Sequence, residues 1–228
     1  MANGFDDVSV AMITKNEERA IEKVVSEIKK HVPEAEIVIV DSSDDKTPEI
    51  AAALGCKVIR QFPPKGYGPA MDKALRSPSR EIIVTLDCDN TYPADKIPEL
   101  IGFIRDGYDL VNASRTYRRP ENMPLSNYIA NRVFALTTRL LHGIKTTDVH
   151  SGMRAYRKKM IDSLNFKVDA SALPVELLIK PVLNNFRFKE VNIDYHERIG
   201  NTTLDHWNST KWTFKRIFKL KFDKEYAK

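Results

Sequence analysis

Short apolar runs alternate with stretches of helical spacing along the first half of the chain. The run at 8–13 predicts a buried strand, and the apolar residues of 17–31 then recur at every third or fourth position, which indicates one face of a helix. The same alternation continues to residue 113. It predicts further strands at 36–40, 57–61, 81–86 and 109–113, and further helices at 48–54, 68–76 and 93–105.

Strands that alternate with helices predict an α/β fold with a mostly parallel, Rossmann-like sheet flanked by helices. The second half is less regular: we expect a long helix at 125–142, a polar segment leading into a strand at 148–156, a helix at 174–185 and a strand at 188–198. No linker rich in Gly, Ser or Pro separates the two halves. We therefore expect one domain over 1–202, followed by a C-terminal amphipathic helix over 203–228.

Polar residues stand where three of the predicted strands end, namely Thr14, Asp41 and Asp87. Ligands of such sheets bind beyond the carboxyl ends of the strands, so we expect a site at this edge. Asp41 could accept a hydrogen bond there from a base or a ribose hydroxyl. The alternative is an aspartate that only forms the turn.

Asp87 and Asp89 follow a buried strand at positions i and i+2, so their side chains point the same way. Two carboxylates that converge repel each other, which raises the pKa of at least one of them. A divalent cation such as Mg²⁺ or Mn²⁺ removes that cost, and it commonly leaves coordination places for phosphate oxygens. The alternative is an Asp-rich turn that caps the next helix, since Asn90 and Thr91 are also good capping residues.

A glycine-containing loop, with Lys65, Gly66 and Gly68, precedes the helix at 68–76. Glycine lets the backbone approach a ligand, Lys65 brings a charge, and the start of a helix favours phosphate. The spacing is neither that of a P-loop nor that of a dinucleotide-binding fingerprint. A flexible turn is an equally good interpretation of this loop.

The composition narrows the class of protein. The chain has 228 residues, of which 42% are hydrophobic and 29% charged, as in ordinary globular domains. A net charge of +5 is too mild to indicate nucleic-acid binding. Cys56 and Cys88 form no CxxC pair, which argues against structural zinc and fits a reducing cytosol. Neither a signal peptide nor an apolar run of about 18 residues is visible, so we expect a cytoplasmic protein.

Taken in order, these segments resemble the inverting family 2 glycosyltransferases, which have a GT-A fold. The resemblance covers residues 8–202. Its last segments are similar to the dolichyl- or polyprenyl-phosphate mannosyl- and glucosyltransferases of that family. The segments that carry the resemblance are 13–18, 39–42, 65–70, 86–89, 114–115, 151–157 and 198–202.

The resemblance implies a Mg²⁺ or Mn²⁺ ion, with Asp89 as a direct ligand and Asp87 on the nucleotide or metal side. The turn at 41–44 lacks the glycine of the commoner motif forms, which leaves both guanine and uracil open. The implied contacts to the nucleotide sugar are Thr14, Asn16, Glu17, Asp41, Lys65, Gly66, Asp87 and Asp89. The implied contacts to the acceptor or to phosphate groups are Ser114, Arg115, Ser151, Arg154 and Arg198.

Inversion by direct displacement needs a base on the acceptor side. The segment Thr146-Thr147-Asp148 is similar to a motif of processive family members whose aspartate is that base, so we expect Asp148 to be catalytic. His150 is the rival base. If the acceptor is already a phosphate, little deprotonation is required, and Asp148 would then only orient the acceptor.

The expected reaction moves a hexose, with mannose favoured, from a nucleotide-diphosphate sugar to a polyprenyl phosphate or another lipid-linked acceptor. GDP-mannose is the favoured donor and UDP-glucose the other candidate. One alternative is the same chemistry with a UDP-sugar and a soluble or glycan acceptor. A second alternative is a nucleotidyltransferase, but such enzymes have a Gly-rich first loop, and the segment Thr14-Lys15-Asn16-Glu17 is not Gly-rich. A third is a non-catalytic module that binds a nucleotide sugar, and the intact acids at 41, 87, 89 and 148 argue against it.

The C-terminal segment combines aromatic and basic residues, with no acid from 206 to 222. Such a helix suits an anionic membrane surface, which would make the protein peripheral at the cytoplasmic face. The alternative is a terminal helix packed on the domain with solvated lysines. The apolar residues at helical spacing are Leu204, Trp207, Phe214, Ile217 and Phe218. The basic residues among them are Lys211, Lys215, Arg216, Lys219 and Lys221.

Overall fold

The computed structural model describes residues 4–169, 172–200 and 206–223, with side chains of the last range described from residue 210 onward. Over this part of the chain, a seven-stranded sheet has the order β3-β2-β1-β4-β6-β5-β7. Its strands are β1 (Val8–Thr14), β2 (Glu36–Asp41), β3 (Lys57–Arg60), β4 (Ile82–Thr85), β5 (Leu110–Ser114), β6 (Arg154–Arg157) and β7 (Phe188–Asn192).

Strand β6 is antiparallel to both of its neighbours, β4 and β5, whereas the other strand pairs are parallel. In register, Thr85 lies beside Arg154 and Asn112 lies beside the same residue on the other side. The start of β6 therefore lies at the edge where β4 and β5 end. The loop before β6, residues 144–153, is brought to that edge for this reason.

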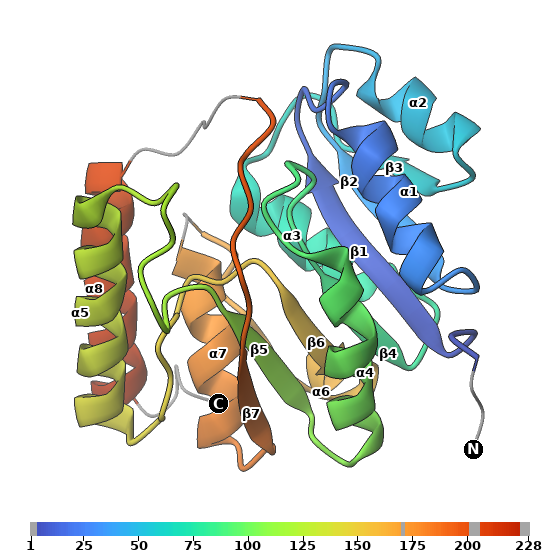
Figure 1. Cartoon of the computed structure of the whole chain (residues 1–228). Coiled ribbons are helices and arrows are strands. Elements are labelled where there is room, and N and C mark those ends of the chain that lie inside the picture. Colours follow the sequence, from blue (N-terminus) through green and yellow to red (C-terminus); the bar gives the residue numbers. More distant parts are fainter. Residues whose placement is uncertain (1–3, 170–171, 201–205, 224–228) are drawn as a thin grey trace.

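Helices cover both faces of the sheet (Figure 1). One face is covered by α1, α2 and α4, and the other by α3, α6 and α7, with α5 and α8 side by side farther out. The helices are α1 (Ile21–His31), α2 (Thr47–Ala53), α3 (Tyr67–Arg76), α4 (Ile97–Arg105), α5 (Leu125–His142), α6 (Lys158–Ser163), α7 (Leu173–Leu183) and α8 (His206–Phe222), with a 3₁₀ turn at Ala94–Lys96.

Helical periodicity and strand alternation account for the core. In α1 the four apolar residues at i, i+3, i+4 and i+7 are all buried against the sheet: Ile21, Val24, Val25 and Ile28. Each contributes about 1.5–3 kcal/mol by leaving water. Along β1, Val10 and Met12 face one helical layer and Ala11 faces the other. The expected α/β fold with a mostly parallel sheet is confirmed.

The helix expected from residue 17 and the strand expected over 188–198 are shorter than expected, and the helix α6 was not expected. The helix expected from residue 17 begins at Ile21, because the preceding backbone is held in a turn in which Glu17 N–H donates to the Thr47 hydroxyl. The strand expected over 188–198 ends at Asn192, because the chain then leaves the sheet and pairs with residues 89–91. The short helix α6 follows β6 directly.

The expected domain boundary at 202/203 lies outside the described residues, as do Leu204 and the side chain of Trp207. Of the C-terminal helix, α8 is described as a 17-residue helix packed against α5 and α7. Ile217 and Leu220 of α8 belong to the core. Packing on the domain, the second interpretation of this segment, thus holds for its inner face.

A substitution at Gly68, in the first turn of α3, can test how closely that helix packs against the backbone at Val168. A Cβ at this position would lie 1.8 Å from the carbonyl oxygen of Val168, so backbone would have to move. We expect Gly68→Ala to destabilise the protein by more than about 2 kcal/mol, measured by urea denaturation. Gly102→Ala in α4 is the matched control, because nothing lies within 4 Å of its Cβ. It should stabilise the protein by up to about 1 kcal/mol; equal effects at both positions would contradict the packing.

Candidate active site

The ends of β1 and β2 form a polar turn around Asp41. Its buried carboxylate accepts hydrogen bonds from the hydroxyls of Thr14 and Ser43 at 2.6 Å each, from the Ser43 N–H at 3.2 Å, and from Arg60. These four bonds fill the roughly four lone-pair positions of a carboxylate. Asp41 and Thr14 therefore hold the turn together, and their expected contact with a nucleoside stays a prediction.

The segment after β1 is fixed to this turn and carries Glu17 toward the aspartate pair. Asn16, at φ 61°, donates its N–H to the Ser43 hydroxyl at 2.8 Å. Burial raises the pKa of Glu17 to about 7, and the charges of Asp89 and Asp87 add to this, while Arg198 opposes it. Glu17 is thus the third carboxylate at one edge of the sheet.

Asp87 and Asp89 have different surroundings. Asp89 is buried, accepts hydrogen bonds from the Thr91 N–H at 3.0 Å and hydroxyl at 2.5 Å, and forms an ion pair with Arg198 at 2.6 Å. Among the described residues, none donates a hydrogen bond to Asp87. Burial and the charge of Asp89 raise the pKa of Asp87 to about 6, although Arg115 and Arg198 lower it.

Arg198 reaches Asp89 because the chain after β7 runs along the turn that follows β4. The Ile199 N–H donates to the Asp89 carbonyl at 2.9 Å, and the His196 N–H donates to the Thr91 carbonyl at the same distance. Arg198 is thus held at Asp89 by backbone pairing, and its expected contact with phosphate stays a prediction.

The carboxylate oxygens suit a hard divalent cation. Magnesium in proteins is commonly held by one or two carboxylates, with the remaining ligands from phosphate and water. Asp87 offers oxygens that no described group occupies, whereas Asp89 would have to share its oxygens with Thr91 and Arg198. Within the described residues, three or more His, Cys, Asp or Glu side chains do not gather in a metal-binding arrangement. The chain could therefore supply only part of the coordination shell.

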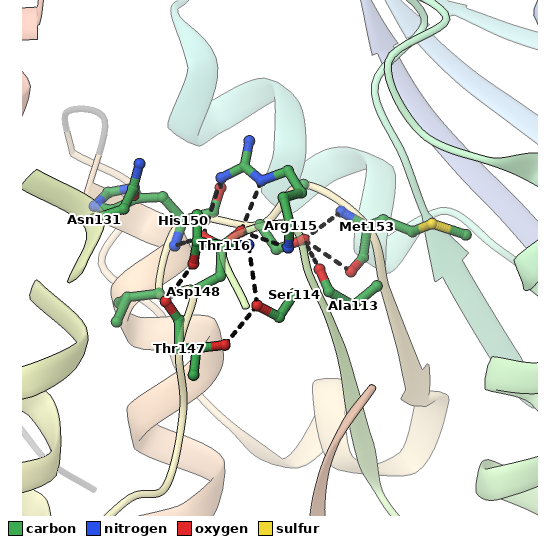
Figure 2. Close-up of polar contacts among 12 residues, drawn as sticks. Ala113, Ser114, Arg115, Thr116, Asn131, Thr147, Asp148, His150 and Met153 are labelled. Carbon is green, nitrogen blue, oxygen red and sulfur yellow. Dashed lines mark hydrogen bonds and ion pairs between the residues drawn. The ribbon is translucent and has the colours of Figure 1, made fainter. Parts of the chain in front are cut away.

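Arg115, which follows β5, and Asp148, in the loop before β6, form the second polar centre (Figure 2). The Arg115 guanidinium donates to Asp148 through Nε at 2.7 Å and Nη2 at 3.0 Å, and its backbone N–H donates to the same carboxylate at 3.2 Å. Nη2 also donates to the His150 carbonyl at 3.0 Å. This paired geometry holds the guanidinium in one orientation.

This environment disfavours Asp148 as a general base. Burial alone raises the pKa of Asp148, but the charge and hydrogen bonds of Arg115 outweigh burial, so the pKa lies below its usual range. The side chain is fully buried and its oxygens are engaged. Burial likewise lowers the pKa of His150 to about 4, and its Nε2 lies 2.8 Å from the Thr213 hydroxyl. Neither side chain therefore has the pKa of a base suited to neutral pH.

A cavity of about 420 Å³ opens beside Arg115. The Arg115 guanidinium lies 5.7 Å from the ring centre of Tyr92 and 5.4 Å from that of Tyr195, and its charge lowers the pKa of Asp87. Arg115 thus belongs to the lining of the cavity and also acts electrostatically on Asp87. It is lined by Arg115, Tyr117, Arg118, Arg119, Pro120, Glu121, Asn122, Ile193, Asp194 and Tyr195.

Three side chains that were expected at phosphate or at the acceptor make hydrogen bonds within the protein. Arg154 is fully buried and donates to the Asn112 side chain and to two backbone carbonyls, each at 2.8 Å. The Ser151 hydroxyl donates to the Ala113 carbonyl at 2.5 Å, and the Ser114 hydroxyl lies 2.6 Å from that of Thr147. All three side chains are hydrogen-bonded within the fold, and their expected contact with phosphate or the acceptor stays a prediction.

Lys65 and Gly66 are exposed before α3, and Gly66 has φ 93°, which explains the glycine there. Sequence reasoning did not single out Glu190, which holds the loop before β6. Its carboxylate accepts hydrogen bonds from Thr146 at 2.5 Å and from the Thr147 N–H at 2.8 Å. No local motif marks Glu190, because its partners lie more than 40 residues away. Arg118 and Arg119 could have been noticed, since they follow Ser114-Arg115 closely.

Comparison with known proteins settles the family. Residues 9–164 match the model described as Glycosyl transferase family 2. The chain belongs to this family. It is a glycosyltransferase, as its sequence motifs led us to expect, and the nucleotidyltransferase alternative is wrong.

Two relatives of this glycosyltransferase are named for lipid phosphates. The chain is 43% identical over 217 residues to the dolichyl-phosphate hexose transferase of Haloferax volcanii, covering 95% of this chain and 94% of that protein. It is 28% identical over 186 residues to the dolichol-phosphate mannosyltransferase of Pyrococcus furiosus. That match covers 76% of this chain and 52% of the relative, so the chain spans about half of its length.

Solved structures share the fold. Glucosyl-3-phosphoglycerate synthase from Mycobacterium tuberculosis, in complex with phosphoglyceric acid, superposes with a TM-score of 0.76 at 22% identity, covering 94% of this chain and 79% of that chain. Its complex with Mn²⁺, UDP-glucose and phosphoglyceric acid gives 0.75 at 22%, covering 93% and 78%. The expected GT-A type of fold is confirmed.

The raised pKa values lead to a pH-dependent stability of the cation-free enzyme. Folded-state values of about 6 for Asp87 and about 7 for Glu17 exceed the ordinary 3.8 and 4.5. Protonated Asp87 and Glu17 therefore favour the folded state. Their contribution to the free energy of unfolding is fully present below pH 3.8 and 4.5, and it is lost as the pH rises through the folded-state pKa values of about 6 and about 7. We expect Asp87→Asn to stabilise the cation-free protein at pH 8 by roughly 1–3 kcal/mol, and by much less at pH 4, in urea denaturation.

Asp6→Asn, at an exposed position, is the control and should change stability little at either pH. Added Mn²⁺ should raise the melting temperature of the wild type at pH 8 but not that of Asp87→Asn. A destabilised Asp87→Asn protein at pH 8 would contradict the repulsion at this edge.

Proposed function

We propose that the protein is an inverting hexosyltransferase that moves a sugar, with mannose favoured, from a nucleotide-diphosphate sugar to a polyprenyl or dolichyl phosphate. The observation that carries this proposal is the arginine-lined cavity that contains Arg115, whose charge also acts on Asp87. A site for a phosphate acceptor needs fixed positive charge next to the place where the donor diphosphate is held. The names of the relatives from Haloferax volcanii and Pyrococcus furiosus support a lipid phosphate as that acceptor.

The donor is assigned to the side of the carboxylates. Asp87 and Asp89 would hold Mg²⁺ or Mn²⁺ together with the diphosphate, and Glu17, Asn16, Lys65 and Gly66 would lie on the nucleotide side. The M. tuberculosis synthase, crystallised with Mn²⁺ and UDP-glucose, supports such a pairing of cation and donor. When bound, the cation neutralises the charge that develops on the departing diphosphate. Arg198, close to Asp89, would add positive charge on the same side.

The acceptor is assigned to the side of Arg115. An acceptor phosphate is already an anion, so its oxygen can attack the sugar C1 without a base while the nucleoside diphosphate leaves from the opposite face. Arg115 would bind that phosphate, and Asp148 would hold Arg115 in place. The lowered pKa of Asp148 and its paired geometry support this positioning role over proton transfer.

A soluble phosphorylated acceptor is the second candidate. The M. tuberculosis synthase, crystallised with phosphoglyceric acid, has the same fold, and an arginine-lined cavity would suit such an acid too. Among the described helices, none combines the length and apolarity that crossing a bilayer requires. We propose that the protein works in the cytoplasm, peripheral to a membrane.

The reaction can be tested with a panel of donors and acceptors. GDP-mannose and UDP-glucose are each incubated with Mn²⁺ and a polyprenyl phosphate, the matching unphosphorylated polyprenol or 3-phosphoglycerate, and products are identified by mass spectrometry. We expect transfer to the polyprenyl phosphate only, and loss of transfer with EDTA. Product from the unphosphorylated polyprenol would contradict the proposed role of the acceptor phosphate. Product from 3-phosphoglycerate alone would favour the soluble acceptor.

Asp148→Asn separates the two roles considered for Asp148. If Asp148 positions Arg115, the variant should raise the KM for the acceptor by about tenfold or more and leave donor affinity unchanged. The pH dependence of the reaction should also stay the same, because Asp148 does not titrate near neutral pH. Asp109→Asn is the control, since Asp109 is also paired to an arginine, Arg157 at 3.3 Å, but lies at the start of β5. A loss of kcat alone, with an altered pH profile, would restore Asp148 as the base.

A further inference from the structure

The outer surface of α5 carries a row of exposed apolar side chains. Their exposed fractions run from 42% to 75%, although large apolar residues are ordinarily buried. We call this row the α5 stripe: Leu125, Ile129, Val133, Leu136 and Leu140. Spacings of three and four residues put all five on one face of the helix. The residues that α5 buries, Phe134, Ala135 and Thr138, lie on the other side.

Positive charge surrounds the α5 stripe. The 18 residues of α5 and the 17 residues of α8 include no aspartate or glutamate. The exposed basic residues of the two helices are Arg132, Arg139, Lys211, Lys215, Lys219 and Lys221. On α8, the exposed side chains also include Trp212, Phe218 and Phe222. Apolar and cationic side chains together are the composition of helices that lie on anionic membranes.

The two helices form one firm unit at the edge of the molecule (Figure 1). Phe134 of α5 packs edge-on against Phe214 of α8, with 5.0 Å between ring centres. On the inner side of α8, the buried Arg216 forms an ion pair with Glu176 of α7 at 2.5 Å. The outer faces of α5 and α8 are therefore presented by helices whose inner faces are fixed to the domain.

The α5 stripe begins next to the arginine-lined cavity. Asn122 lines that cavity, and Leu125 is the first residue of α5. From Leu125 to Leu140 the stripe extends about 22 Å along the helix axis. An amphiphilic acceptor whose phosphate occupies the cavity could thus keep its hydrocarbon chain close to an apolar surface of the same protein.

We propose that the α5 stripe is a membrane-docking face, with α5 lying in the headgroup region of an anionic bilayer and its apolar side chains reaching the acyl chains. This inference rests on the proposed transfer to a lipid phosphate. Charge complementarity favours a bilayer over a second copy of the chain. A two-fold symmetric contact would set the same basic surface against itself, whereas anionic lipids neutralise it.

Vesicle flotation tests the docking face directly. Wild-type protein should float with vesicles of phosphatidylcholine and phosphatidylglycerol and should be released by high salt, since part of the attraction is electrostatic. The double variant Leu136→Gln/Leu140→Gln should lose binding by about tenfold or more. Leu183→Gln, at an exposed leucine at the end of α7, is the matched control and should bind like the wild type. Melting temperatures of both variants should match the wild type.

Two results would overturn the proposal. One is a double variant that floats as well as the wild type, or a wild type that does not float. The other is a wild type that sediments as a dimer without lipid while the double variant is a monomer, because the stripe would then be a contact between copies.

Transfer assays separate this proposal from the proposed function. With a short, water-soluble prenyl phosphate as acceptor, the double variant should be as active as the wild type, whereas with a long-chain polyprenyl phosphate in vesicles it should be much less active. Equal loss with both acceptors would contradict a docking role. If no phosphate acceptor is used by either protein, the proposed function fails, but binding to vesicles that depends on the stripe would still support the docking face.

Discussion

The burial of carboxylates at one edge of the sheet is the constraint around which the site is organised, and repulsion among them adds to its cost. Parallel strands bring their carboxyl ends together, so Asp87, Asp89 and Glu17 meet where the surrounding protein screens charge poorly. Arg198 compensates in part, and it does so only because the chain leaves β7 early and runs beside the turn after β4. The early end of β7, at Asn192, thus frees the following residues to pair with the turn after β4.

The reversed strand β6 connects this edge to the second polar centre, that of Arg115 and Asp148. Because β6 starts at the edge where its neighbours end, the loop before it brings Asp148 to Arg115. The polar residues of this loop are satisfied inside the fold, by Glu190 on one side and Arg115 on the other. The Arg115 guanidinium is held in one orientation by these bonds, and a small part of the side chain, 12%, stays exposed. Rigid placement of a charged group of this kind is how a site lowers the cost of binding an anion.

Sequence periodicity predicted the elements better than the roles of individual side chains. The long helix was expected at 125–142 and is found there, since its apolar repeat and Gly143 define both ends. Asp41 ends β2 as expected, whereas β4 ends at Thr85, so strand alternation does not orient Asp87 and Asp89, which lie beyond the strand. Arg154 was expected at phosphate, and its side chain is buried and bonded to Asn112 and to the carbonyls of Pro174 and Val149, of which the first two lie 42 and 20 residues away. Such partners depend on tertiary contacts, which spacing along the chain does not reveal.

Spacing along the chain also does not reveal which face of α5 packs against the domain. Its sequence is apolar on two faces, and a pattern of apolar residues alone does not tell which face packs inward. Only the placement of Phe134 against α8 identifies the inner face and leaves the other exposed. Leaving so large an apolar surface in water is unfavourable unless something covers it. That surface begins three residues beyond Asn122, which lines the arginine-lined cavity, so whatever covers the α5 stripe would also lie close to the entrance of a ligand into that cavity.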